Sequence, residues 1–251
     1  MGALVSKFSR HNDEEQYRFW SAIASSLRLG WLGSEDKDRE VKVCQYALFP
    51  LLLNTSALQG DIVTIQTHIQ QGADVCMPDS RGRTALHLAA SEADVQTVGF
   101  LLAKGAEINA RDHVGGTPIL DAIRCKNLEV IKFLVNKGAM LDMSDVDLGT
   151  EMCCLAYLGD LEQMEAWRVA GVSLNYADAD GRTPLHVAVC TNQEDVVKYC
   201  MKHGANLELR DRFNNRPIDD AQRLSLTNLE EVLNSKGKKH MAKTSDAIPE
   251  A

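Results

Sequence analysis

The sequence lacks any long apolar run. Its two longest apolar stretches, residues 46–53 and 95–103, are far shorter than the roughly 18–20 residues that a membrane-spanning helix needs. We therefore expect no membrane span. The 251 residues are otherwise ordinary, with 45% hydrophobic and 25% charged side chains, which are typical values for globular proteins. This composition argues against wholesale disorder and against collagen-like or coiled-coil filaments.

Basic residues are in the minority. The chain has 27 Lys and Arg against 35 Asp and Glu, which gives a net charge of −8, and its pI is about 5.4. A domain that binds the nucleic-acid backbone usually carries a basic face, so we expect no nucleic-acid partner. The acidity lies in the middle of the chain, because residues 46–233 carry −10, residues 1–45 are neutral and residues 234–251 carry +2.

Motifs for metals, redox chemistry, phosphates and secretion are missing as well. None of the seven cysteines has C-x-x-C spacing, which zinc ribbons and thioredoxin-like motifs use. Neither G-x-x-x-x-G-K-[ST] nor G-x-G-x-x-G occurs, and the first residues do not form a secretory signal. We expect no cofactor and no metal, and reduced cytoplasmic thiols that serve mainly as small buried apolar groups.

What the sequence does contain is a repeat. One glycine recurs every 33 residues without slippage, and one aspartate does the same. The glycines are Gly72, Gly105, Gly138, Gly171 and Gly204, and the aspartates are Asp79, Asp112, Asp145, Asp178 and Asp211. Since glycine makes up about 7% of an average protein, coincidence does not explain five of them in register. A period of this length is typical of repeat architectures.

Two of the repeats carry a recognisable motif. Residues 79–87 (DSRGRTALH) and 178–186 (DADGRTPLH) resemble the D-x-x-G-x-T-P-L-H opening of ankyrin repeats. Each is followed by a helical pattern that closes on Gly-Ala. The residue types suit the roles: Thr84 and Thr183 can cap a first helix, Pro184 suits its first turn, and the periodic glycine can end the second helix in a left-handed cap.

We therefore predict an all-α fold, an ankyrin-repeat solenoid of helix-turn-helix and hairpin units with an N-terminal helical cap. The first repeat lacks its hairpin, and Pro50 is expected at the start of its first helix. The fourth repeat has lost the motif, and the last is polar, as a capping repeat requires. The predicted divisions are a segment and cap at 1–45, repeats at 46–78, 79–111, 112–144, 145–177, 178–210 and 211–233, and a basic flexible tail at 234–251.

The segment before the repeats has its own pattern. Trp20, Ile23, Leu27 and Trp31 follow at spacings of three and four, which predicts a helix with one apolar stripe. We expect this helix to cover the open end of the stack. The alternative is a helix lying on a membrane surface, but the segment lacks the basic polar face expected of such helices.

The extreme N-terminus predicts a lipid anchor. Residues 1–6 (MGALVS) fit the M-G-x-x-x-[ST] pattern for N-myristoylation at Gly2. Lys7 and Arg10 follow, with no acidic residue before Asp13. One myristoyl chain gives a membrane affinity of only about 10⁴ M⁻¹, so binding would be weak and reversible. We expect a cytoplasmic protein that is peripheral to membranes if Gly2 is acylated.

The fourth repeat has a second resemblance. It is similar to the C-terminal ankyrin region of animal cytosolic L-asparaginase/lysophospholipase proteins, and the likeness extends more weakly over residues 20–233. The residues that carry it are Gly149–Tyr157, Asp160–Glu162, Trp167 and Ala170–Gly171. In that family a separate N-terminal domain performs the hydrolysis, with T-G-G-T-I and H-G-T-D-T segments that do not occur here. The resemblance implies kinship with the accessory region and not amidohydrolase activity.

The remaining catalytic candidates fit structural roles. Gly115–Thr117 aligns with residues 82–84 and 181–183, which marks it as part of the repeat. His87 and His186 are expected to hydrogen-bond neighbouring backbone and link adjacent repeats. Cys153 stands at the same repeat position as these histidines, and Cys154 is expected on another side of the helix. We predict no catalytic residues.

What remains is a binding surface. Hairpin tips project from ankyrin repeats and commonly contact partners, although an Arg after the turn glycine is ordinary and usually solvated. The partner-binding candidates are Arg81, Arg83, His113, Arg182, Arg212 and Phe213, of which Phe213 is a large apolar group where polar residues are usual. We predict a non-catalytic adaptor that binds an unidentified protein. The alternative is a fragment or regulatory part of an L-asparaginase/lysophospholipase whose catalytic domain is absent from this chain.

Overall fold

The fold is known from a computed structural model, which describes residues 37–234 and, within that range, the side chains of residues 47–234. Helices and turns make up this range, and no residue in it lies in a β-strand. The chain divides between Met140 and Leu141 into two compact units. Their described parts are the N-terminal unit (37–140) and the C-terminal unit (141–234).

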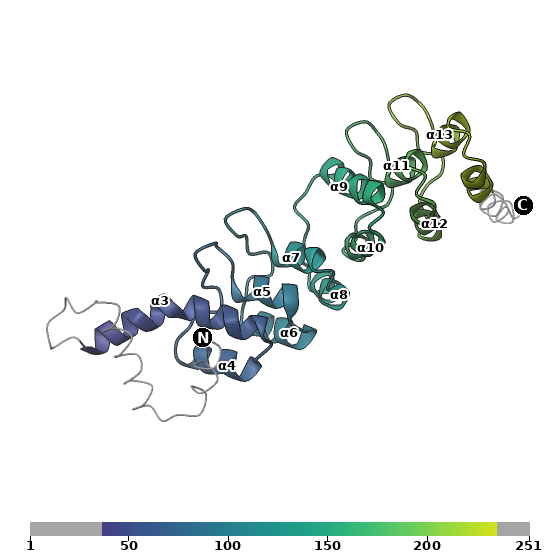
Figure 1. The fold of residues 1–251 in the computed structure, drawn as a ribbon. Coiled ribbons are helices and arrows are strands. Elements are labelled where there is room, and N and C mark those ends of the chain that lie inside the picture. The colour runs from purple at the N-terminus through teal and green to yellow at the C-terminus, as the bar shows by residue number, and fades with distance from the viewer. Residues whose placement is uncertain (1–36, 235–251) are drawn as a thin grey trace, which may run out of the picture. The chain divides into compact units, whose positions relative to one another are not determined.

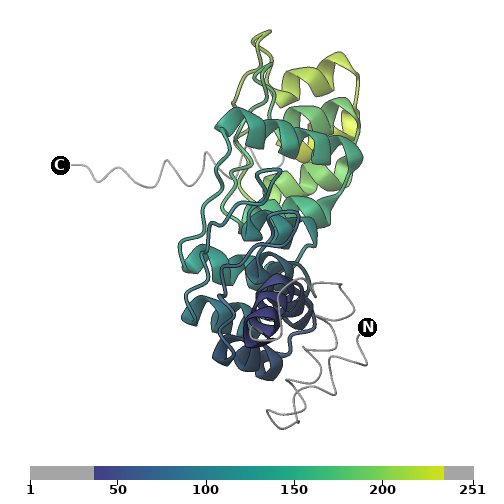
Figure 2. The same cartoon turned by 90° about the vertical axis from the view of Figure 1, so that its left-hand side faces the viewer.

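The N-terminal unit is built from helix pairs (Figure 1). Its helices are α3 (Lys37–Leu58), α4 (Ile62–Gln70), α5 (Ala85–Glu92), α6 (Val95–Ala103), α7 (Pro118–Arg124) and α8 (Leu128–Asn136). Within the pairs, α3 packs on α4, α5 on α6 and α7 on α8, and α5 lies between α3 and α7. Hairpin loops at residues 79–83 and 112–116 project from one side of these helices (Figures 1 and 2).

The C-terminal unit repeats this arrangement. Its helices are α9 (Asp145–Leu158), α10 (Leu161–Val169), α11 (Pro184–Cys190), α12 (Glu194–Lys202) and α13 (Pro217–Arg223), and residues 227–234 are also helical. Here α9 packs on α10 and α11 on α12, while α11 lies between α9 and α13. Hairpin loops at residues 178–182 and 211–215 precede α11 and α13.

The helix ends follow the 33-residue period. The side chains of Asp61, Asp94, Asn127 and Asp160 each accept a hydrogen bond from the backbone N–H three residues later, as N-cap residues do. Each such cap stabilises a helix by about 1 kcal/mol. At the other end, the periodic glycines have φ between +83° and +98°, a region that glycine enters without strain. The predicted left-handed cap is confirmed.

The core of each unit lies between its helices. Leu86, Ile119 and Ile123 of the N-terminal unit are fully buried, as are Met152 and Leu185 of the C-terminal unit. Burial of a large apolar side chain is worth about 1.5–3 kcal/mol, so these contacts order helices that are too short to persist alone. Thr84 and Thr183 are N-cap residues, as predicted.

The prediction for Pro50 was wrong. The first helix of the repeats does not begin there, because α3 runs unbroken from Lys37 to Leu58 with Pro50 inside it. A proline in a helix interior removes one backbone hydrogen bond and costs about 3 kcal/mol. The buried side chains of Phe49 and Leu53, each 1% exposed, flank the proline and hold the helix in place. The expected boundary between residues 45 and 46 therefore falls within a continuous helix.

In the fourth repeat a helix replaces the hairpin. The Ser144 hydroxyl accepts a hydrogen bond from the Asp147 backbone N–H, and α9 begins at Asp145. The helix can then pass close to the following segment only because residue 149 is glycine. A Cβ atom on Gly149 would lie 2.3 Å from the carbonyl oxygen of Ala177, far inside van der Waals contact.

Candidate interaction surface

Each hairpin is held by its own aspartate. The Oδ1 atom of Asp79 accepts hydrogen bonds from the backbone N–H groups of Arg81 and Arg83, at 2.8 and 2.9 Å. Asp112, Asp178 and Asp211 accept the equivalent pairs in their own loops. The periodic aspartates therefore organise the loops.

Neighbouring tips within a unit are also bonded to each other. In the N-terminal unit the backbone N–H of His113 donates to the carbonyl of Arg81, and in the C-terminal unit Arg212 donates to Asp180, both at 2.9 Å. The approach is close, because a Cβ on Gly82 would lie 2.6 Å from the His113 ring. Each unit therefore presents a pair of linked tips.

The predicted binding residues differ in whether their side chains are free to contact a partner protein. Arg81 and His113 are exposed, and Phe213 is 61% exposed. The Arg83 guanidinium instead turns back to Asp79 at 3.1 Å, and Arg212 pairs with Asp180. These two cations have partners within their own unit, so they do not form part of a row of free positive charges.

Two of the candidates form a cation–aromatic pair. The Arg212 guanidinium lies 4.9 Å from the centre of the Phe213 ring, which is a favourable cation–π distance. Arg182 differs from its counterpart Arg83, because it is half-buried and its Nε atom is enclosed without a hydrogen-bond partner. The structure therefore brings Arg212 and Phe213 together and turns Arg182 into the protein.

The charge at Asp79 is stabilised locally. Burial alone would raise the pKa of its carboxyl, but hydrogen bonds from the backbones of Arg83 and Arg81 and the Arg83 guanidinium outweigh burial, so the pKa lies below its usual value. A carboxylate bonded to N–H donors is stabilised in its ionised form. Asp79 therefore acts as the anchor of its loop and is already neutralised by Arg83.

His87 and His186 have the structural role that the sequence predicts. The Thr84 backbone N–H donates to Nδ1 of His87 at 3.1 Å, and Nε2 of His87 lies 3.2 Å from the carbonyl oxygen of Gly116. His186 makes the same contacts with Thr183 and Asn215. Both rings are fully buried, so each joins a helix to the next hairpin and has no nitrogen left for a substrate.

The Gly115–Thr117 segment belongs to the repeat. Thr117 is the N-cap residue of α7, and a Cβ on Gly116 would lie 2.9 Å from the Asp112 carboxylate. The interpretation of this segment as structural is confirmed. Among the side chains of residues 47–234, no three His, Cys, Asp or Glu converge on a point that could hold a metal ion.

The cysteines with described side chains fall into three groups, of which Cys76 and Cys190 are intermediate in burial. Cys153 and Cys200 are buried, and burial raises the pKa of each thiol to about 12, which leaves them unreactive. Cys154 and Cys125 are exposed. The expectation of mainly buried thiols therefore holds for Cys153 and Cys200 and was wrong for Cys154 and Cys125. Cys154 lies on another side of α9 from Cys153, as expected, and Cys125 is the C-cap residue of α7. The side chain of Cys44 lies outside the described residues.

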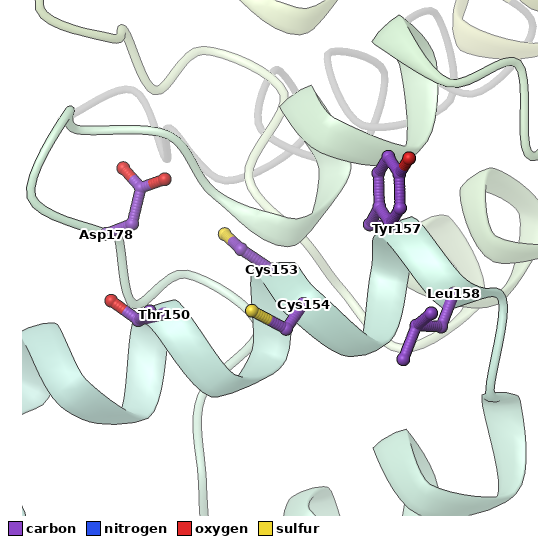
Figure 3. Close-up of a pocket in the computed structure, with 6 residues that line it drawn as sticks. All are labelled: Thr150, Cys153, Cys154, Tyr157, Leu158 and Asp178. Carbon is purple, nitrogen blue, oxygen red and sulfur yellow. The ribbon is translucent and has the colours of Figure 1, made fainter.

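Sequence reasoning missed a hollow on α9. It has a volume of about 370 Å³ and is lined by Thr150, Cys153, Cys154, Tyr157, Leu158 and Asp178 (Figure 3). Tyr157 and Leu158 are 63% and 70% exposed. A signal was present, because the N-terminal unit carries polar Ser91 and Glu92 at these two repeat positions.

A polar network joins α10 to α12. The Arg168 guanidinium donates two hydrogen bonds to the Glu165 carboxylate, at 2.6 and 2.7 Å, and the Tyr199 hydroxyl donates a third at 2.7 Å. The bonds from Arg168 and then Tyr199 outweigh the effect of burial and lower the pKa of Glu165 to about 2. This cluster holds two helices together, and its carboxylate is fully engaged.

Two models of known protein families match the repeat region of the chain. The model of the family described as ankyrin repeats (3 copies) matches residues 53–145, and that described as ankyrin repeat matches residues 180–212. The intervening residues include the first turns of α9, where a helix stands in place of a hairpin. The predicted all-α repeat fold is confirmed.

Several curated proteins contain similar sequence. An L-asparaginase of Dirofilaria immitis is 35% identical over 76% of this chain and 32% of its own length. A 60 kDa lysophospholipase of Mus musculus is 43% identical over 68% of this chain and 30% of its own length. The potassium channel GORK of Arabidopsis thaliana is 49% identical over 71% of this chain and 22% of its own length. The chain thus spans about a third or less of these relatives.

A solved structure supports the same fold. A chain from the complex of a predatory endopeptidase of Bdellovibrio bacteriovorus with an immunity protein superposes with a TM-score of 0.52. The match covers 74% of this chain and 97% of that chain at 24% identity. Within residues 37–234, no helix is both long and apolar enough to cross a bilayer.

Proposed function

Because this chain belongs to the ankyrin-repeat family, we propose that it is a non-catalytic adaptor that binds a partner protein through its hairpin tips and the adjoining helix faces. One contrast supports this function. Arg81, His113 and Phe213 point into solvent at the tips, whereas His87 and His186, the side chains best suited to catalysis, are buried in structural hydrogen bonds.

The test is a comparison of two triple variants. Replacing Arg81, His113 and Phe213 with alanine should weaken capture of the partner and leave the melting temperature nearly unchanged, because all three side chains are exposed and such groups stabilise little. The matched control replaces Lys132, Lys198 and Val63, which are similarly exposed but lie on helices. Partners are identified by affinity capture and mass spectrometry from cells. Equal loss of capture in both variants, or a large loss of stability in the first, would contradict the surface role.

The second candidate is an accessory part of an asparaginase-type enzyme. The similarity to an L-asparaginase and a 60 kDa lysophospholipase, of which this chain spans about a third, supports it. In this case the chain would regulate or oligomerise a catalytic domain that it does not itself contain. An asparagine-hydrolysis assay tests the purified chain for activity of its own. Affinity capture from cells separates the two proposals, because an accessory part should recover a polypeptide that carries the asparaginase-type catalytic domain. We expect no turnover, and turnover that co-purifies with the chain would overturn the adaptor proposal.

A lipid anchor at Gly2 is a separate proposal about location. Gly2 lies outside the described residues, and the support for it is the sequence pattern of residues 1–6. The protein would then be cytoplasmic and weakly bound to membranes. Intact mass of protein from eukaryotic cells should show loss of Met1 and addition of one myristoyl group, and Gly2→Ala should abolish that addition. A mass that corresponds to free Gly2 or retained Met1 would end this proposal.

A further inference from the structure

We propose that the hollow on α9 is the docking site for a partner segment that combines apolar anchors with a basic residue. In this arrangement the apolar side chains lie against Tyr157 and Leu158, and a Lys or Arg of the partner pairs with Asp178. The inference rests on the proposed binding function and gives it a site and a partner chemistry.

The apolar part of the site is one face of a helix. Thr150, Cys154 and Leu158 follow at spacings of four along α9, and Tyr157 lies three residues after Cys154, so all four fall on one side of the helix. Figure 3 shows them along the helix, with Asp178 on the loop beside it. An exposed aromatic and an exposed leucine in adjacent positions form a patch that soluble proteins usually cover.

This patch is particular to α9. At the position of Tyr157, α3 carries Leu58, α5 Ser91, α7 Arg124 and α11 Cys190, and none of these four is followed by a large apolar residue. A general feature of the repeat would appear in every helix of this type. The adjacent apolar pair on α9 is therefore not a requirement of the fold, because α5 has Ser91 and Glu92 at the same two positions.

The hollow suits side chains of a bound segment. It has a volume of about 370 Å³ and is open to solvent rather than enclosed, which suits contact with a chain that lies across it. Its floor is Cys153, which is buried beneath the exposed side chains. A hollow of this size accommodates one or two side chains of a protein that lies across it.

At the edge of the hollow, Asp178 carries a negative charge that is not paired with any described cation. Its Oδ1 atom accepts the backbone N–H groups of Asp180 and Arg182, both at 2.9 Å, and no described cation pairs with its Oδ2. The counterpart in the N-terminal unit is different, because Asp79 Oδ2 is paired with the Arg83 guanidinium at 3.1 Å. Arg182 stands where Arg83 stands, but it does not make this pair.

The net charge of the whole C-terminal unit has the same sign as the charge of Asp178. The C-terminal unit, residues 141–234, has 17 acidic and eight basic residues, a net charge of −9, whereas residues 37–140 have 11 of each and are neutral. Complementary charge raises association rates and selects partners. The acidity found in the sequence is therefore concentrated in the unit that contains the hollow, and this favours a basic partner segment.

The test uses synthetic peptides and the full-length chain. Three fluorescein-labelled peptides share leucines one helical turn apart and differ only in their flanking residues, which are lysine, serine or glutamate. Fluorescence anisotropy should show the tightest binding for the lysine peptide and none for the glutamate peptide. Equal affinity for all three, or no saturable binding of the lysine peptide, would overturn the proposal.

Two substitutions separate the apolar contribution from the charge. Tyr157→Ser together with Leu158→Ser should abolish binding of both the lysine and serine peptides, and Val63→Ser, at a residue that is 68% exposed on α4, is the control. Asp178→Asn retains the oxygen that organises the loop. It should weaken only the lysine peptide, by about two- to fivefold as expected for an exposed ion pair, and Asp79→Asn should leave binding unchanged.

The same variants distinguish the proposed docking site on α9 from the broader proposal that the chain is an adaptor. If the full chain captures its cellular partner equally well with Tyr157→Ser and Leu158→Ser, the adaptor proposal stands and the docking site is wrong. The chain's own basic tail, with Lys236, Lys238, Lys239 and Lys243, is another basic segment. If changing these four lysines to serine raised peptide affinity many-fold, the hollow would belong to the tail and the proposal of a separate partner would be overturned.

Discussion

The Cys153 thiol donates a hydrogen bond to the backbone carbonyl of Arg182, with 3.2 Å between sulfur and oxygen. Cys153 stands 66 residues after His87, and His87 bonds the carbonyl of Gly116 in the same way. In both cases the acceptor lies 29 residues after the donor. Asn54 reaches the Arg83 carbonyl across the same separation, at 3.4 Å. Three chemically different side chains therefore tie a helix to the next hairpin.

These bonds predict that replacing His87 and replacing Cys153 will lower the free energy of unfolding by different amounts. His87→Ala should lower the free energy of unfolding by about 2–3 kcal/mol, because it removes a fully buried ring with its bond to the Gly116 carbonyl and leaves the Thr84 N–H buried without a partner. Cys153→Ala should cost about 1 kcal/mol, since a thiol is a weak donor. Urea unfolding followed by circular dichroism measures both. Equal losses would show that the hydrogen bond does not determine the difference.

The close approach at Gly149 predicts a severe effect of one methyl group. Gly149→Ala should destabilise the protein by at least about 1–3 kcal/mol, because the new Cβ would collide with the Ala177 carbonyl. Gly99→Ala in α6 is the matched control. Its Cβ would lie 3.4 Å from the Phe133 ring, and alanine should stabilise the helix by up to about 1 kcal/mol. Similar melting temperatures for the two variants would contradict the geometry around α9.

The Glu165 cluster predicts that part of the free energy of unfolding is lost at low pH. The pKa of Glu165 is about 2 in the folded protein, below its ordinary value of 4.5. Its contribution is therefore complete above pH 4.5 and is lost as the pH falls towards 2. We expect about 1–2 kcal/mol after allowance for solvent screening. The difference in unfolding free energy between wild type and Glu165→Gln should shrink across this window.

A matched variant isolates that effect from general acid unfolding. Glu194 pairs with Lys198 on the surface of α12, and both side chains are about half exposed. Glu194→Gln should therefore follow the wild-type pH profile closely. If Glu165→Gln also followed it, the bonds from Arg168 and Tyr199 would not stabilise the folded state.

The cysteines predict an order of alkylation. Iodoacetamide should modify Cys154 and Cys125 in the native protein, whereas Cys153 and Cys200 should react only in urea. Burial both covers the second pair and raises their thiol pKa to about 12, and the thiolate is the reactive form. Peptide mapping by mass spectrometry gives the order. Modification of Cys200 under native conditions would mean that α12 packs more loosely than the buried position of Cys200 indicates.

The candidate site was only partly predictable from the sequence. The exposure of Phe213 and Arg81 follows from their places at loop tips, where neighbours are local. The internal partners of Arg83 and Arg212 could not be read from the sequence, because a guanidinium on a flexible stem can reach several carboxylates. The hollow was missed because Tyr157 and Leu158 read as ordinary apolar helix residues, and only packing shows that nothing in residues 37–234 covers them.

The sequence by itself determined the repeat, its register, the helix caps, the hairpin positions and the linking role of His87 and His186. These features depend on local requirements, such as a left-handed glycine every 33 residues or an aspartate that caps its own loop. Only the tertiary structure decided that α3 runs through Pro50, that α9 replaces a hairpin and that no cation among residues 47–234 pairs with Asp178. These outcomes depend on contacts between segments distant along the chain, where buried packing outweighs the preference of any single residue.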